Sequence, residues 1–216
     1  MNRPTRLLTC LAVVAVLAGC KREGELVVSE GVGITAVRTP CPAVGIPDYT
    51  GNVTMFRNAG AATADNIDVV ANITNLRSTC DETGPRVYTN ATFDVLARRM
   101  DVRGARQVQL PYYSTVLRGG SQVVTKRLGT VTLNFADGQE RAEATAQAGA
   151  FVDRAEATLP SDIRERITRR RKPGDPDAAL DPLADPEVRA ALNRATFELL
   201  VGFQLSNDQL AYNATR

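Results

Sequence analysis

The chain has 216 residues, no histidine, no tryptophan and a formal net charge of +2 at pH 7. The lack of histidine excludes Ser-His-Asp and Cys-His catalytic arrangements, histidine general bases and histidine-ligated zinc. The near balance of 26 basic and 24 acidic residues argues against general nucleic-acid binding, because such binding needs many Lys and Arg side chains to neutralise phosphates.

The N-terminal segment has the residue order of an export signal. Arg3 and Arg6 form a short basic region, residues 7–17 are mostly apolar, and Lys21 and Arg22 follow soon after. The apolar run is about half of the roughly 20 residues that a membrane-spanning helix needs. A cleaved signal peptide over residues 1–19 is therefore expected, rather than a transmembrane helix.

The signal ends in Leu17-Ala18-Gly19-Cys20, which resembles the lipobox of bacterial lipoproteins. The resemblance covers residues 1–21 and implies that Cys20 becomes the lipid-modified first residue, with residues 20–25 as a tether. Two or three acyl chains anchor a protein stably to a membrane. In Gram-negative lipoproteins an aspartate after the cysteine favours the inner membrane, so Lys21 implies the periplasmic face of the outer membrane. The alternative is an ordinary signal peptide in which Cys20 is incidental.

The remaining cysteines predict one disulfide. Cys10 is lost with the signal and Cys20 carries lipid, which leaves Cys41 and Cys80 in an exported chain. The bridge closes a loop of about 40 residues and is expected to contribute roughly 4 kcal/mol. The alternative, a reactive or metal-binding pair, lacks C-x-x-C spacing and any histidine, so no metal and no cofactor are expected. Removal of Arg3 and Arg6 lowers the basic count from 26 to 24, which equals the acidic count.

Residues 26–158 are predicted to form a mainly β domain. Apolar and polar residues alternate in the stretches 67–74, 87–95, 108–112, 131–135 and 142–150, and less clearly in 26–37 and 49–57. About seven short strands, separated by turn signals at intervals near ten residues, are typical of an antiparallel sandwich. The pattern resembles immunoglobulin-like or fibronectin-like modules in architecture only.

The predicted disulfide does not match the intersheet bridge of immunoglobulin domains. Cys41 lies between Pro40 and Pro42, where a central strand is unfavourable. We therefore expect the bridge to pin the N-terminal segment to the loop after the strand that starts near Ile67.

The C-terminal quarter is predicted to contain short helices and one further strand. A basic helix is expected within 159–172, and four prolines and four aspartates in 173–186 predict a linker without a core of its own. In the segment 187–216, a helix is expected as far as about Ala195. Pro186, just before this segment, suits the first turn of that helix. The alternation in 197–205 favours a strand that returns to the sandwich, the alternative being a longer helix. Ser206 and Gln209 match a capping box, which predicts a last short helix.

One basic cluster is a candidate binding site for lipopolysaccharide phosphates, anionic lipid or an acidic protein. It consists of Arg164, Arg166, Arg169, Arg170, Arg171 and Lys172. Arginine suits such partners because its guanidinium matches phosphate and carboxylate groups. The alternative, which we favour, is a solvated helix end whose charges pair with the acidic residues that follow. Tyr112 and Tyr113 are expected to face opposite sides of one strand.

No catalytic residues are predicted. The sequence has no complete phosphate-binding glycine loop and no S-x-x-K motif, and carboxylate pairs such as Asp137 with Glu140 fall at a turn. The expected function is therefore a non-enzymatic, membrane-anchored interaction or scaffold module with a protein partner in the cell envelope. The alternative is a carrier of a small ligand or lipid, which requires a pocket between the sheets.

Overall fold

The computed structural model describes residues 39–58, 62–169, 171–172, 174–177 and 180–215. The predicted signal peptide, Cys20, the tether, the weak strand at 26–37 and Arg170 lie outside these residues. Within the described ranges, no helix has the length and hydropathy that would let it span a bilayer.

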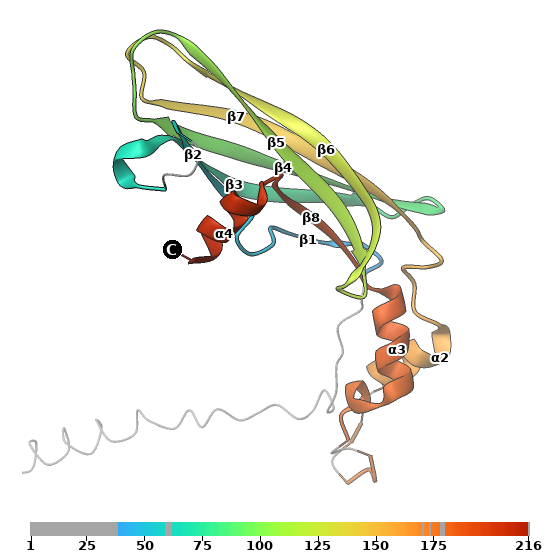
Figure 1. Cartoon of the computed structure of the whole chain (residues 1–216). Coiled ribbons are helices and arrows are strands. Elements are labelled where there is room, and N and C mark those ends of the chain that lie inside the picture. Colours follow the sequence, from blue (N-terminus) through green and yellow to red (C-terminus); the bar gives the residue numbers. More distant parts are fainter. Residues whose placement is uncertain (1–38, 59–61, 170, 173, 178–179, 216) are drawn as a thin grey trace, which may run out of the picture.

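Two four-stranded sheets pack face to face, which confirms the mainly β sandwich (Figure 1). The first sheet runs in the order β1 (Ala43–Gly45), β8 (Phe197–Phe203), β5 (Arg106–Arg118) and β6 (Gln122–Phe135). The second runs β2 (Asn52–Phe56), β3 (Ile67–Asp81), β4 (Arg86–Arg99) and β7 (Arg141–Asp153). All described pairs are antiparallel except β1 with β8, which is parallel.

Several strands extend well beyond the alternating stretches. β3 continues past a register shift between Thr74 and Arg77 and still pairs with β4 at Cys80, opposite Thr89. Pairing between strands needs only backbone N–H and C=O groups, so exposed polar residues continue it without any apolar pattern. The expectation that Cys80 lies in a loop after the strand was therefore wrong, because Cys80 belongs to β3 itself.

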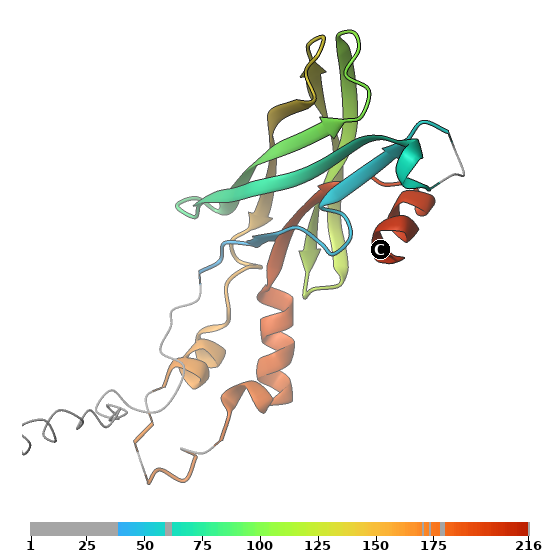
Figure 2. The same ribbon diagram turned by 90° about the vertical axis from the view of Figure 1, so that its left-hand side faces the viewer.

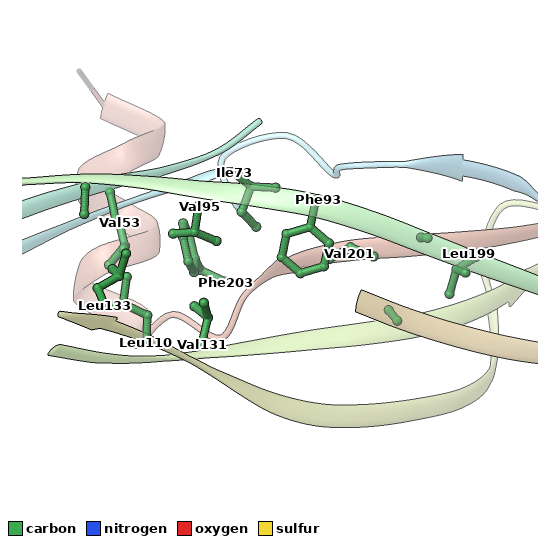
Figure 3. Packing of buried hydrophobic residues seen from close by; sticks show 14 of the residues in the cluster. Val53, Ile73, Phe93, Val95, Leu110, Val131, Leu133, Leu199, Val201 and Phe203 are labelled. Atoms are coloured by element: carbon green, nitrogen blue, oxygen red, sulfur yellow. The ribbon is translucent and has the colours of Figure 1, made fainter. Parts of the chain in front are cut away.

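The apolar residues of the alternating stretches meet between the sheets (Figure 3). Phe93 of β4 is 1 % exposed and Leu133 of β6 is fully buried. β8 contributes Leu199, Val201 and Phe203 to the same cluster. Each such side chain contributes roughly 1.5–3 kcal/mol when fully buried, so β8 belongs to the core of the sandwich. The strand interpretation of the segment after α3 (Pro186–Ala195) is confirmed.

Tyr112 of β5 contacts strands of the opposite sheet. Its ring packs edge-on against Phe93 with centroids 5.3 Å apart, and its hydroxyl donates to the carbonyl oxygen of Gln147 on β7 at 2.8 Å. The ring lies across Gly129, where a side chain would collide with it. Burial raises the pKa of Tyr112.

Tyr113 faces the other side of β5, with the ammonium of Lys126 5.0 Å from its ring centre, as the alternation predicts.

Two helices form a small second core beside one end of the sheets (Figure 2). α2 (Ser161–Thr168) and α3 bury Ile163, Ile167 and Val188 against each other. Asp185 caps α3, because its Oδ1 accepts from the backbone N–H of Glu187 at 2.8 Å.

The C-terminal part of the segment 173–186 packs on a core formed by other elements. Leu183, in a 3₁₀ turn at Pro182–Ala184, packs on the core formed by α2 and α3. One apolar side chain among many prolines and aspartates is enough to attach this part of the segment.

α4 (Asn207–Thr215) closes the described chain against β2. The capping box forms as predicted, since Gln209 Oε1 accepts from the Ser206 N–H at 2.9 Å and Ser206 Oγ accepts from the Gln209 N–H at 3.2 Å. Tyr212 packs edge-on against Phe56.

Candidate functional site

The predicted disulfide between Cys41 and Cys80 is present, with Cα atoms 6.1 Å apart. Close by, the hydroxyl of Thr39 donates to a carboxylate oxygen of Glu82 at 2.8 Å. The described chain therefore enters the fold beside the β3–β4 hairpin, and a covalent bond holds it there.

The basic cluster is largely paired with acidic residues of the same chain. Arg166 contacts Asp185 at 2.5 Å and Glu187 at 2.8 Å. Asp177 pairs with both Arg169 and Arg171. Hydrogen bonds from the Glu187 and Val188 backbone N–H groups and from Arg166, with the charge of Arg166, lower the pKa of Asp185.

These pairs limit what the cluster can offer to a partner. Arg171 is only 6 % exposed, and its Nη2 donates to the carbonyl oxygen of Arg166 at 3.3 Å. Arg164 and Lys172 are exposed, and among the described residues neither side chain has an ion pair. The pairing with acidic residues agrees with the alternative we favoured, but Arg171 is buried rather than solvated. We call these ion pairs the framework of α2 and α3.

The carboxylates considered for chemistry are held by structural contacts. Asp137 accepts from the backbone N–H of Gly104 at 2.6 Å, and Glu140 pairs with Arg98. In the part of the chain that the structure describes, no three or more Asp, Glu or Cys side chains are placed to hold a metal ion.

The outer face of the β2–β3–β4–β7 sheet carries a shallow groove of about 710 Å³ at the end where β4 finishes. Leu96 and Met100 are 45 % and 40 % exposed there. The residues that line this groove, which we call the distal groove, are Val70, Asn72, Leu96, Ala97, Arg98, Met100, Gln139, Arg141, Ala142 and Glu143. The distal groove thus combines apolar side chains with charges of both signs.

An aromatic pair occupies the opposite end of the same face. Tyr88 of β4 and Phe151 of β7 are directly paired, with ring centroids 4.6 Å apart, and are 37 % and 50 % exposed. The guanidinium carbon of Arg86 lies 4.6 Å from the centre of the Phe151 ring. We call Arg86, Tyr88 and Phe151 the aromatic row. A side chain at Gly149 would come within 2.8 Å of the Tyr88 hydroxyl, so the glycine leaves room for the ring.

Neither surface was identified from the sequence. A signal was present, because Tyr88, Leu96 and Phe151 are large apolar residues at positions where the alternation calls for polar ones. Single exposed apolar residues are common on protein surfaces. Only the strand register shows that Tyr88 and Phe151 are neighbours.

Comparisons with known proteins identify no relative. No protein-family model, no curated protein and no solved structure matches the chain. The function has to be inferred from the residues of this chain.

Proposed function

We propose that this protein is an exported lipoprotein, anchored through Cys20 to the periplasmic face of the outer membrane, whose sandwich is a non-catalytic module that binds a protein of the cell envelope. The lipobox supports the anchor. The Cys41–Cys80 disulfide supports export, since such bridges persist mainly in oxidising compartments.

The observation that carries the binding role is the distal groove. Leu96 and Met100 provide apolar contact area, and methionine adapts its shape to different partners. Arg98, Arg141 and Glu143 surround them with charge. Protein interfaces commonly combine an apolar centre with a polar rim in this way. The partner expected from this chemistry inserts an apolar side chain and carries charges of both signs.

The alternative of a carrier has no specific observation in its favour. The space between the sheets is occupied by a continuous cluster of apolar side chains such as Phe93, Leu133 and Phe203. The distal groove opens on the outer face of one sheet instead.

Two experiments test the two parts of the proposal. Globomycin, which blocks lipoprotein signal peptidase, should cause a precursor with residues 1–19 to accumulate, and its absence would refute the anchor. For the binding role, a photo-crosslinking residue is placed at Leu96 in cells, with the same residue at the exposed Asn134 of the other sheet as a matched control. We expect a discrete protein adduct from position 96 only. Equal adducts from both positions, or none from 96, would contradict the binding role.

A further inference from the structure

The aromatic row lies at the end of the sandwich where the described chain enters the fold. Asp81, Tyr88 and Phe151 are aligned across β3, β4 and β7. Cys80, the residue before Asp81, is bonded to Cys41. The Cys80 sulfur accepts from the buried Thr89 hydroxyl at 3.6 Å, so the disulfide is at the same end of the sheet as the rings but on its inner side. Along the sheet, the Tyr88 position is therefore about one strand spacing, roughly 5 Å, from the end of β3 that holds the entering chain, and the Phe151 position about two, roughly 10 Å.

The anchor is connected to this end of the sandwich by a short stretch of sequence. About 20 residues separate Cys20 from Cys41, and such a length cannot span more than roughly 75 Å. Leu96 lies eight positions beyond Tyr88 along β4, which adds about 26 Å at the rise of a strand. The aromatic row is thus closer than the distal groove to the attachment of the lipid-bearing segment.

The side chains of the aromatic row have the chemistry of a membrane interface. Tyrosine has an apolar ring and a polar hydroxyl, and arginine keeps its charged group in water while its stem contacts apolar surface. Aromatic residues are enriched at the level of lipid headgroups for this reason. Phe151 is half exposed and in contact with Arg86, so both present themselves outward from the sheet.

The charges around the row are balanced. Arg86 and Arg154 are exposed on the basic side, and Asp81 and Asp153 on the acidic side. Asp81 already accepts from the hydroxyl of Thr83 at 2.7 Å. A balanced set gives no strong attraction to anionic lipid, so contact should depend on the rings and on zwitterionic headgroups.

We infer that the aromatic row rests on the lipid surface that carries the anchor, with phospholipid headgroups as its ligand. This inference rests on the proposed function, since the lipid on Cys20 brings the row to the membrane. The contact would orient the sandwich with the β3–β4 hairpin toward the membrane. The distal groove, at the other end of the same sheet face, would then lie farther from the membrane, accessible to a partner in the periplasm.

The composition of the chain permits a direct test. The sequence contains no tryptophan, so one introduced indole reports a single position. In the chain from Cys20 onward, Cys41 and Cys80 are bonded to each other, which leaves Cys20 as the one free thiol. Coupling Cys20 to a maleimide-bearing lipid in phosphatidylcholine vesicles anchors the protein whether or not a cell would lipidate it. Failure of this inference can therefore be distinguished from failure of the proposed function.

The measurement compares Phe151→Trp with Leu96→Trp, two partly exposed positions at opposite ends of one sheet face. Brominated phosphatidylcholine is expected to quench Phe151→Trp at least twofold, with a blue shift in emission, and to leave Leu96→Trp unchanged. Adding salt should not alter this, because the contact is not chiefly ionic. Equal quenching of both variants, quenching of neither, or loss of quenching in salt would overturn the inference.

Discussion

Arg99 donates a hydrogen bond from its Nη1 to the carbonyl oxygen of Gly104, 2.8 Å away, although the arginine is only 1 % exposed. The same guanidinium donates to the carbonyl oxygens of Val102, Ala136 and Gln139 at 2.7–2.8 Å. These residues belong to the connections after β4 and after β6. One buried side chain therefore fastens two turns at the same end of the sandwich.

Replacing Arg99 should be severely destabilising. Arg99→Ala leaves several buried carbonyl oxygens without a donor, and we expect a loss of about 3–5 kcal/mol in the free energy of unfolding. Arg99→Lys should recover only part of this, because an ammonium lacks the planar set of five donors. Urea titration followed by circular dichroism measures both effects.

The neighbouring Arg98 is the matched control. Its side chain is 56 % exposed and pairs with Glu140 at the surface, so Arg98→Ala should cost less than about 1 kcal/mol. Similar losses for Arg98→Ala and Arg99→Ala would contradict the role assigned to Arg99.

Removal of the disulfide should destabilise the protein by about 2–4 kcal/mol, because the unfolded chain gains entropy when the loop opens. The variant Cys41→Ser with Cys80→Ser should show this loss in urea titration. A reducing agent should lower the midpoint of the unmodified protein and leave that of the double variant unchanged. If the reductant shifted both midpoints equally, the bridge would not be the cause.

Asp68 makes the stability of the fold depend on pH. It accepts two hydrogen bonds from Arg106 at 2.6 and 2.7 Å, and these bonds lower the pKa of Asp68 below its ordinary value of 3.8. A carboxylate with a lowered pKa stabilises the fold above its unfolded-state pKa and loses that contribution as the pH falls through its folded-state pKa. Asp68→Asn should therefore cost about 1 kcal/mol at pH 7, since Arg106 is partly solvated.

The difference between Asp68→Asn and the unmodified protein should shrink below pH 4. Thermal unfolding at several pH values tests this. Asp48→Asn serves as the control, because Asp48 is exposed and its carboxylate has no ion pair among the described residues, so the substitution should leave the midpoint unchanged at every pH. A constant effect of Asp68→Asn between pH 7 and pH 3 would exclude the titration of this carboxylate.

The arginines of the basic cluster should differ in their effect on the fold: some stabilise α2 and α3, and others are exposed without such an effect. Arg171→Ser removes a buried contact to Asp177, and amide hydrogen exchange in α3 should become about tenfold faster or more, since local opening becomes easier. Arg164→Ser, on the exposed side of α2, should leave this exchange unchanged. If Arg164→Ser accelerated exchange as much as Arg171→Ser, the framework assigned to these ion pairs would be incorrect.

The strands with strict alternation were predictable from sequence. One face of each strand is buried, and this places an apolar residue at every second position. The ends of these strands were not predictable, since polar residues such as Arg77 and Lys126 continue the pairing through backbone groups alone. β1 was missed because its three residues are too few for a pattern. The pairing of Cys41 with Cys80 followed from elimination, but the position of Cys80 inside β3 did not.

The candidate surfaces were less predictable than the fold. In sequence, Arg99 and Arg171 are members of charged runs, and such runs are usually solvated. Their burial depends on carbonyl oxygens and carboxylates brought together by the fold, such as those of Gln139 and Asp177. In the same way, Tyr88 and Phe151 lie more than 60 positions apart and become neighbours only through strand register.

The mass of the N-terminal peptide of the protein purified from membranes tests the proposed lipid anchor most directly. We predict that this peptide begins at Cys20 and carries a diacylglyceryl group on its sulfur and an acyl chain on its amine. A peptide that begins elsewhere, or an unmodified Cys20, would contradict the claim.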